Sequence, residues 1–239
     1  MSIMTQNFVP VTKAAHQNKK IKPIQTFNFA SKIHMVSVMM HEFLNAASVY
    51  PIVFLEDTEQ STFRPMALLG LEPEDNLFIN KEGAWKAPYI PAIIRRYPFA
   101  LAKTPNEDQF TICIDEASDA VNEEEGQPLY NDDGTIGPVM EQVKQYLSGL
   151  QQMEMVTTNF CKALKDKYMF TPLNMHVREA EAVKRLTGAY AVHEEKLNNL
   201  SDDDFLEFRK NNYLPAIYSH LTSLTQINRL AELRTQRNA

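Results

Sequence analysis

The segment "PIVFLEDTEQSTFRPMALLGL", residues 51–71, decides the fold class of this chain. It holds two short runs rich in β-forming and apolar residues, and the polar residues "DTEQS" between them predict a hairpin loop. A second pair follows, "FALAKT" at 99–104 and "QFTICIDE" at 109–116, with residues 105–108 as the connection. Both connections are short, so both pairs predict antiparallel strands.

The second half of the chain has helical periodicity. Pro138 occupies a first helical position, and a long amphipathic segment follows it. Its apolar stripe consists of Val139, Val143, Tyr146, Leu150, Met153, Phe160 and Leu164. Ser201 can cap a further helix, and the segment from about Leu214 repeats apolar residues every three to four positions. These patterns predict an α+β protein, mainly an antiparallel sheet from the N-terminal half with an amphipathic helical C-terminal half packed on it.

Three other segments carry weaker local signals. Residues 36–48 have apolar residues at helical spacing and predict a helix that ends before Pro51. The short, proline-bracketed "YIPAIIRRYP" at 89–98 predicts one or two helical turns. The segment "LNMHVREAEAVKRLTGAYAVHEEKLNNL", residues 173–200, alternates and predicts two strands that return to the sheet.

Charge is distributed unevenly along the chain. Residues 1–33 contain lysines and no acid, and we expect them to form an extended arm over a single domain at 34–235. Between Lys103 and Lys144 the situation is reversed, because acids occur there without any Lys or Arg. This acidic region is interpreted either as solvated loops or as a surface that meets a basic partner.

Bulk composition excludes several classes. A formal net charge of −6 disfavours a nucleic-acid binder, and no apolar run is long enough to span a membrane. Cys113 and Cys161 lie far apart and form no C-x-x-C, which is typical of buried thiols in a reducing compartment. The N-terminal residues lack the layout of a secretion signal. We therefore expect a cytoplasmic location without membrane insertion.

Arg95 and Arg96 are the first candidate ligand-binding residues. Adjacent guanidinium groups suit a carboxylate or phosphate, so the pair predicts a clamp for an acidic ligand. The structural alternative pairs one arginine with Glu72 or Asp115 and leaves the other at the rim of a pocket.

The remaining candidates are Trp85, Tyr89, Tyr97, Asp115 and Ser118. The aromatic residues could line a pocket for an apolar or aromatic ligand, or simply belong to the core. The Asp-x-x-Ser pair stands at a strand end, where it could serve a site or form a turn or helix cap.

Signatures of catalysis and of cofactors are missing from the sequence. It contains no G-x-S-x-G, no phosphate-binding glycine motif, and no His or Cys pair with metal-ligand spacing. We therefore expect neither a metal nor a cofactor, and the absence of these motifs favours a protein that binds over one that catalyses.

Several blocks resemble those of the bacterial SapC-like family. They are "ALLGLEPEDNLFINKEGAWKAPYIPAIIRRYPFALA" at 67–102, "FTICIDEAS" at 110–118 and "GQPLYNDDG" at 126–134. The segments "LTGAYAVHEEKLNNLSDDDF" at 186–205 and "AIYSHLTSLTQINRL" at 216–230 are similar to later parts of the family. The chain departs at Ala189, where the family usually has Leu, and at Val192-His193, where it usually has Ile-Asp.

The resemblance implies a function only in outline. Members are associated with bacterial surface-layer proteins, and relatives are often encoded near TonB-dependent receptors and flavin-dependent halogenases. It implies a non-enzymatic soluble accessory, or a small-molecule or peptide-binding protein, of surface-protein or peptide and nutrient uptake systems. The ligand would be an acidic or aromatic small molecule or a peptide, and a protein partner is also open. The alternative is an enzyme or enzyme partner that acts on peptides or amino acids alongside a flavin-dependent halogenase.

Overall fold

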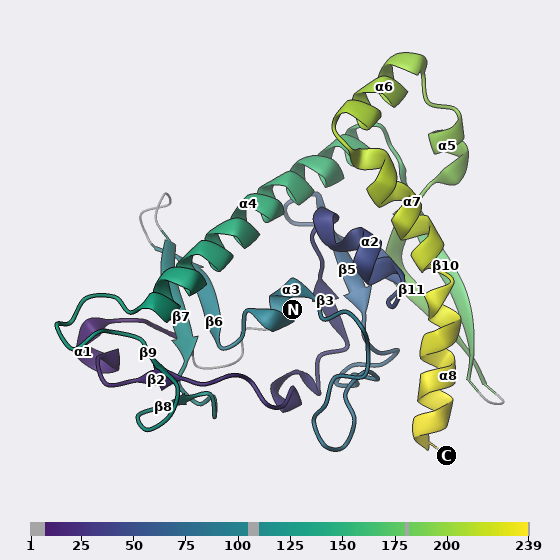
Figure 1. Ribbon diagram of the computed structural model, residues 1–239. Coiled ribbons are helices and arrows are strands. Elements are labelled where there is room, and N and C mark those ends of the chain that lie inside the picture. Colours follow the sequence, from purple (N-terminus) through teal and green to yellow (C-terminus); the bar gives the residue numbers. More distant parts are fainter. Residues whose placement is uncertain (1–7, 105–109, 180–181, 239) are drawn as a thin grey trace. The chain divides into compact units, whose positions relative to one another are not determined.

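The computed structural model describes residues 8–104, 110–179 and 182–238. The loop expected at 105–108 lies outside these residues. The chain folds into two compact units (Figure 1). Unit 1 comprises residues 1–26 and 93–152, and unit 2 comprises residues 27–92 and 153–239. Unit 1 thus includes much of the segment that the sequence analysis describes as an arm.

Unit 1 contains the second predicted strand pair. Strand β7 (Phe110–Asp115) lies between β6 (Phe99–Lys103) and β1 (Phe8–Pro10), and all pairing is antiparallel. The short helix α1 (Lys13–His16) follows β1. This sheet packs against the start of the long helix α4 (Pro138–Asp166), whose residues 138–152 belong to unit 1. The core consists of Phe99, Ile114, Leu129, Met140 and Leu147.

A small second sheet joins the basic and acidic regions of unit 1. Its order is β8 (Val121–Asn122), β2 (Lys20–Ile21) and β9 (Gln127–Pro128). Lys19 Nζ lies 2.8 Å from the carboxylate of Glu123, and Lys22 Nζ lies 3.6 Å from that of Glu125. Glu123 and Glu125 are exposed, as expected of solvated loops, and both also contact lysines of the chain's own N-terminal segment.

Gly126 permits this close approach of β2. Its φ of +105° is a conformation that side chains rarely adopt, and a Cβ there would lie 2.3 Å from the carbonyl oxygen of Ile21. A larger residue at 126 would therefore push β2 away from the acidic loop.

Unit 2 is built on a five-stranded antiparallel sheet with the order β10-β11-β4-β5-β3. Its strands are β3 (Met35–Ser37), β4 (Ile52–Asp57), β5 (Thr62–Leu68), β10 (Phe170–Glu179) and β11 (Ala182–Val192). The predicted hairpin at 51–71 is the pair β4–β5, and the two returning strands are β10 and β11. The long helix, the helical turn at 92–95 and the helices near the C-terminus are also confirmed, so the chain is an α+β protein.

Unit 2 contains the helices η1 (Asn28–Ala30), η2 (Met40–Glu42), α2 (Phe43–Ala47), α5 (Glu194–Asn198), α6 (Asp202–Lys210), α7 (Tyr213–Ser223) and α8 (Gln226–Asn238), and α3 (Ala92–Arg95) begins at the end of the unit. Of these, α2, α7 and α8 contact strands of the sheet, and α6 packs against α7 (Figure 1). Ser201 caps α6 as expected, because its side chain accepts a hydrogen bond from the amide of Asp204 at 3.2 Å. No helix within the described residues is long and apolar enough to cross a membrane.

The helix predicted over residues 36–48 is wrong for its first half. Val36 pairs with Ala67 in the sheet, and Val36 and Val38 are buried while Ser37 between them is exposed. This alternation is that of a strand, and helix begins only at Met40. Pairing with β5 satisfies the backbone of this segment, which outweighs its helical spacing.

A chain of aromatic rings forms the core of unit 2. Phe160 of α4 contacts Phe43 of α2 at a ring distance of 6.0 Å and Phe54 of β4 at 6.3 Å. The ring of Tyr213 extends this cluster, because its centroid lies 5.3 Å from that of Phe160 and 5.7 Å from that of Phe208 of α6. Aromatic pairs at such distances add to the free energy gained from burial, so sheet and helices share one core.

His220 joins helix α7 to two strands of this sheet. Its Nε2 accepts a hydrogen bond from the amide of Val192 at 3.0 Å, and its Nδ1 lies 2.8 Å from the carbonyl oxygen of Ile52. Ser223 of the same helix accepts from the amide of Ile52 at 2.9 Å. These partners require a neutral imidazole with its proton on Nδ1. Burial lowers the pKa of His220 to about 4.

This geometry predicts an acid-sensitive unit 2. An unfolded histidine takes up a proton below its ordinary pKa of 6.5, whereas the folded one resists it down to about 4. The stabilisation is therefore complete above pH 6.5 and is lost as the pH falls toward 4, by about 3 kcal/mol at most. Urea unfolding at several pH values, followed by the fluorescence of Trp85 in unit 2, measures this loss.

The matched variants are His220→Gln and His41→Gln, since His41 is exposed. His220→Gln should be less stable at neutral pH and should lose less of its stability on acidification than the parent. His41→Gln should retain the parental pH dependence. If the free energy of unfolding of His220→Gln depends on pH as steeply as that of the parent, the imidazole does not couple stability to pH.

Candidate ligand-binding site

The structure separates the seven candidate residues into two groups. Trp85 and Tyr89 belong to unit 2, whereas Arg95, Arg96, Tyr97, Asp115 and Ser118 belong to unit 1. The two groups are therefore described one after the other.

Trp85 and Tyr89 belong to a hydrogen-bonded network in unit 2. The indole of Trp85 donates to the hydroxyl of Tyr50 at 3.0 Å, and that hydroxyl donates to the carbonyl oxygen of Tyr89. The hydroxyl of Tyr89 donates to the buried carboxylate of Glu42 at 2.6 Å, which also accepts from the amide of Ala92 at 2.8 Å. Burial raises the pKa of the Tyr50 hydroxyl. These contacts give both candidate residues a structural role.

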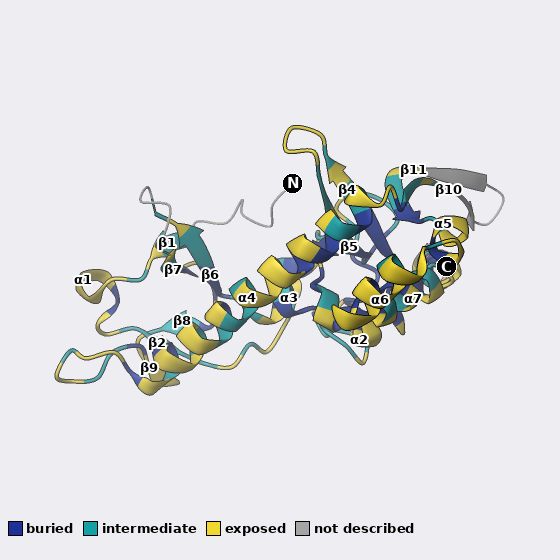
Figure 2. Ribbon diagram, turned by 90° about the horizontal axis from the view of Figure 1, so that it is seen from above, coloured by how far each residue is buried: buried dark blue, intermediate teal, exposed yellow. Residues whose placement is uncertain are grey.

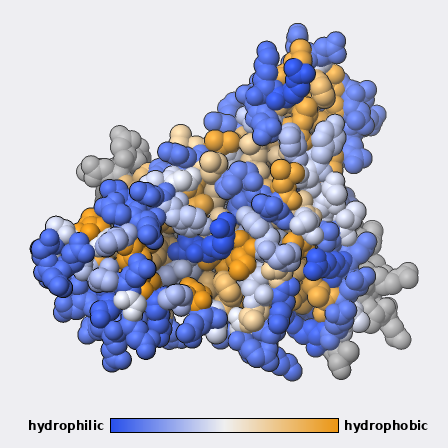
Figure 3. Space-filling model, viewed as in Figure 1, coloured by the Kyte–Doolittle hydropathy of each residue, from blue (hydrophilic) through white to orange (hydrophobic). Residues whose placement is uncertain are grey.

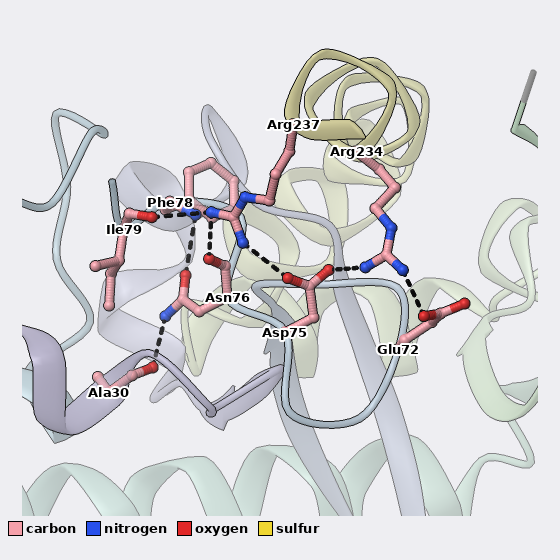
Figure 4. Close-up of polar contacts among 8 residues, drawn as sticks. All are labelled: Ala30, Glu72, Asp75, Asn76, Phe78, Ile79, Arg234 and Arg237. Carbon is pink, nitrogen blue, oxygen red and sulfur yellow. Dashed lines mark hydrogen bonds and ion pairs between the residues drawn. The ribbon is translucent and has the colours of Figure 1, made fainter. Parts of the chain in front are cut away.

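The loop at residues 72–79, which comes before Trp85 in the chain, is held by the last helix, α8 (Figure 4). Arg234 donates to the carboxylates of Glu72 and Asp75. Arg237 donates to Asp75 at 2.8 Å and to the carbonyl oxygens of Asn76 and Ile79 at 2.8 and 2.9 Å. The two arginines are three positions apart and so lie on one face of the helix.

Asn76 fastens the same loop from its other side. Asn76 is 1% exposed. Its side-chain nitrogen donates to the carbonyl oxygen of Ala30 at 3.0 Å, and its side-chain oxygen accepts from the backbone amide of Phe78 at 3.0 Å (Figure 4). The sequence reasoning named Glu72 as a partner for Arg95 or Arg96 and missed Arg234. The spacing of Arg234 and Arg237 is a visible signal, but their distance along the chain from Glu72 conceals the contact.

Arg234→Gln should therefore destabilise unit 2 by about 2–3 kcal/mol, because it removes the guanidinium that the partly buried carboxylates of Glu72 and Asp75 share. Urea unfolding followed by Trp85 fluorescence is the measurement. Arg209→Gln is the matched control, since Arg209 is exposed on α6, and should change stability by less than about 0.5 kcal/mol. Equal small effects of both substitutions would contradict a structural role for Arg234.

Three candidates of the other group, Arg95, Arg96 and Tyr97, line a pocket of unit 1 with a volume of about 300 Å³, whereas Asp115 and Ser118 do not. Three segments line this pocket: residues 21–24 from the end of β2 onward, residues 95–99 from the end of α3 into β6, and the first turns of α4. Arg95 is exposed, while Arg96 and Tyr97 are half-buried. The residues from α4 are Val139, Gln142, Val143, Tyr146 and Leu147.

Tyr97, Asp115 and Ser118 are connected beside this pocket. The hydroxyl of Tyr97 donates to the buried carboxylate of Asp115 at 2.9 Å. Burial, together with a hydrogen bond to Asp115 and its negative charge, raises the pKa of Tyr97 to about 12, against a weaker opposing effect of Ser118. The amide of Ser118 donates to the carbonyl oxygen of Asp115 at 3.2 Å, and Ala117 donates to its carboxylate at 3.1 Å. Asp115 and Ser118 thus form a turn, one of the two interpretations that the sequence left open.

Tyr97→Phe should cost unit 1 about 1–2 kcal/mol, because the buried carboxylate of Asp115 loses one of its donors. Urea unfolding followed by circular dichroism measures the change. Tyr218→Phe, at an exposed position, should be close to neutral. A Tyr97→Phe variant as stable as the parent would mean that this hydrogen bond contributes nothing to the fold.

The charge of the pocket comes from its rim. Lys22, Arg95 and Arg96 are among the residues that line it, and no acid occurs among the described lining residues. The face shown in Figure 3 has hydrophilic and apolar side chains interspersed over unit 1. The arrangement offers cations beside apolar walls.

Among the described residues, no group of three His, Cys, Asp or Glu side chains is placed to hold a metal ion. Cys113 and Cys161 are buried free thiols. Burial raises the pKa of Cys161 to about 12, which keeps that thiol protonated.

These elements define an α+β protein with a cationic, apolar-walled pocket in one of its two units. The sequence model of the SapC family matches residues 11–230, and the chain belongs to that family. No curated protein and no solved structure matches the chain.

Proposed function

We propose that this SapC-family protein is a non-enzymatic accessory that binds a small molecule or peptide in the pocket of unit 1. We further propose that it works in the bacterial cytoplasm, in support of surface-protein or peptide and nutrient uptake systems. One observation carries the proposal: Arg95, Arg96 and Tyr97, from the SapC-like block at residues 67–102, all line one pocket.

The pocket has the properties of a small-molecule site. Its volume of about 300 Å³ is at the lower end of the range of such sites. Its walls are mainly aliphatic and aromatic, and its few charged groups are all positive. Apolar walls provide affinity, and a small number of polar groups orient the ligand.

The neighbouring polar groups support binding more than catalysis. The raised pKa of Tyr97 keeps its hydroxyl protonated at neutral pH, where it donates to Asp115. The hydroxyl of Ser118 accepts from the amide of Ala120 at 3.3 Å. An enzyme acting beside a flavin-dependent halogenase would have to draw on these same groups, and each already holds the local backbone or its neighbour.

Filling the pocket should abolish binding without unfolding the protein. In Val143→Phe a larger side chain enters the pocket from α4, and the dissociation constants of bound fragments should rise at least tenfold. A library of neutral, anionic and cationic aromatic and aliphatic fragments, screened by two-dimensional NMR, provides the measurement. Hits should shift the resonances of residues 21–24, 95–99 and the first turns of α4.

Val156→Phe is the matched control, because Val156 is an exposed valine on the same helix. It should bind fragments like the parent. The proposal fails if the fragments bind elsewhere, or if Val143→Phe binds them as well as the parent does.

A further inference from the structure

The chemistry of the pocket narrows the class of its ligand, an inference that rests on the proposed function of the same site. Three features carry it: the cations at the rim, the length of the apolar stripe on α4, and the shortage of hydrogen-bonding groups between them.

The rim favours an anion. Arg95, Arg96 and Lys22 each bring a positive charge to the pocket. The contact of Lys22 with Glu125 is 3.6 Å long and largely exposed on the acidic side, so it is a weak pair with which a ligand can compete. Guanidinium groups bind carboxylates through charge-assisted, often paired hydrogen bonds. The anionic group of the ligand therefore belongs at this rim.

The wall formed by α4 favours a linear apolar body. Val139, Val143 and Leu147 follow one another at four-residue spacing and share one face of the helix, where the two valines are partly exposed and Leu147, a core residue, forms the buried end of the stripe. Figure 2 shows exposed residues along one side of α4 and less exposed ones along the other. Eight residues of helix span about 12 Å. An extended alkyl chain, with C–C bonds of about 1.5 Å, covers that length with roughly ten carbons.

The walls offer little to a peptide backbone. Pro23 and Pro98 have no N–H to donate. Apart from the cations, the described lining residues offer side-chain hydrogen-bonding groups at Gln142, Tyr97 and Tyr146, and the hydroxyl of Tyr97 already donates to Asp115. A peptide laid along this stripe would bury backbone groups without partners, which is unfavourable. An alkyl chain has no such groups.

We propose that the ligand is an alkyl carboxylate of about ten carbons. Its carboxylate binds at Arg95, Arg96 and Lys22, and its chain lies along the apolar stripe of α4.

Isothermal titration of the full chain with decanoate, kept below its micellar concentration, tests the proposal. Decanamide, which has the same chain without the charge, should bind at least tenfold more weakly. Each methylene removed from decanoate should weaken binding about three- to fourfold. A tripeptide of leucine should bind more weakly than decanoate.

The variants test the charged end of the ligand. Combined Arg95→Gln and Arg96→Gln should weaken decanoate at least tenfold and should bring its affinity close to that of decanamide. Lys144→Gln is the matched control, because Lys144 is an exposed cation on α4, and should bind decanoate like the parent. Circular dichroism checks that each variant is folded. If the double variant is not, Lys22→Gln and the decanamide comparison still test the charge.

The outcomes distinguish this inference from the proposed function. If decanamide or the tripeptide binds as tightly as decanoate while Val143→Phe still blocks fragments, the pocket remains a binding site and the alkyl carboxylate is wrong. If decanoate binds equally to the parent and to Val143→Phe, its site lies elsewhere and the inference fails. If Val143→Phe also leaves fragment binding unchanged, both proposals fail.

Discussion

The sheet of unit 2 depends on the buried, neutral imidazole of His220. Strands β4 and β11 pair through Phe54 and Tyr190, and nearby the amide of Val192 and the carbonyl oxygen of Ile52 bond to the two nitrogens of His220. Buried backbone groups must find partners, and helix α7 supplies them. One side chain thereby aligns two strands that are distant in sequence with the helix that covers them.

The SapC-like block at residues 67–102 contributes to both units. Its first part, with Glu72, Asp75 and Asn76, is held by the guanidinium groups of α8 and by the backbone of Ala30 (Figure 4). Its later part, with Arg95 and Arg96, contributes to the pocket of unit 1. This block therefore serves two structural purposes, a loop held by α8 and a wall of the pocket.

The uneven charge of the chain also has a local cause. Lys20 lies in β2 with Lys19 and Lys22 on either side of the strand, and Glu123, Glu124 and Glu125 belong to the loop between β8 and β9. Exposed ion pairs of this kind contribute little stability individually, yet they accompany the short strands that hold residues 21–24 in place. Those residues form one wall of the pocket, so the charge pattern supports the candidate site indirectly.

Local patterns in the sequence determined the hairpin β4–β5, the pair β6–β7, the long helix after Pro138 and the cap at Ser201, because each depends on residues close together in the chain. Arg95, Arg96 and Tyr97 were candidates from the sequence, share one short segment and line the pocket together. Only the tertiary structure decided that Val36 belongs to a strand, that Arg234 binds Glu72, and that Trp85 and Tyr89 serve a network apart from the pocket. These outcomes depend on partners far away in sequence, and local periodicity carries no information about which distant group will satisfy a buried charge or a backbone amide.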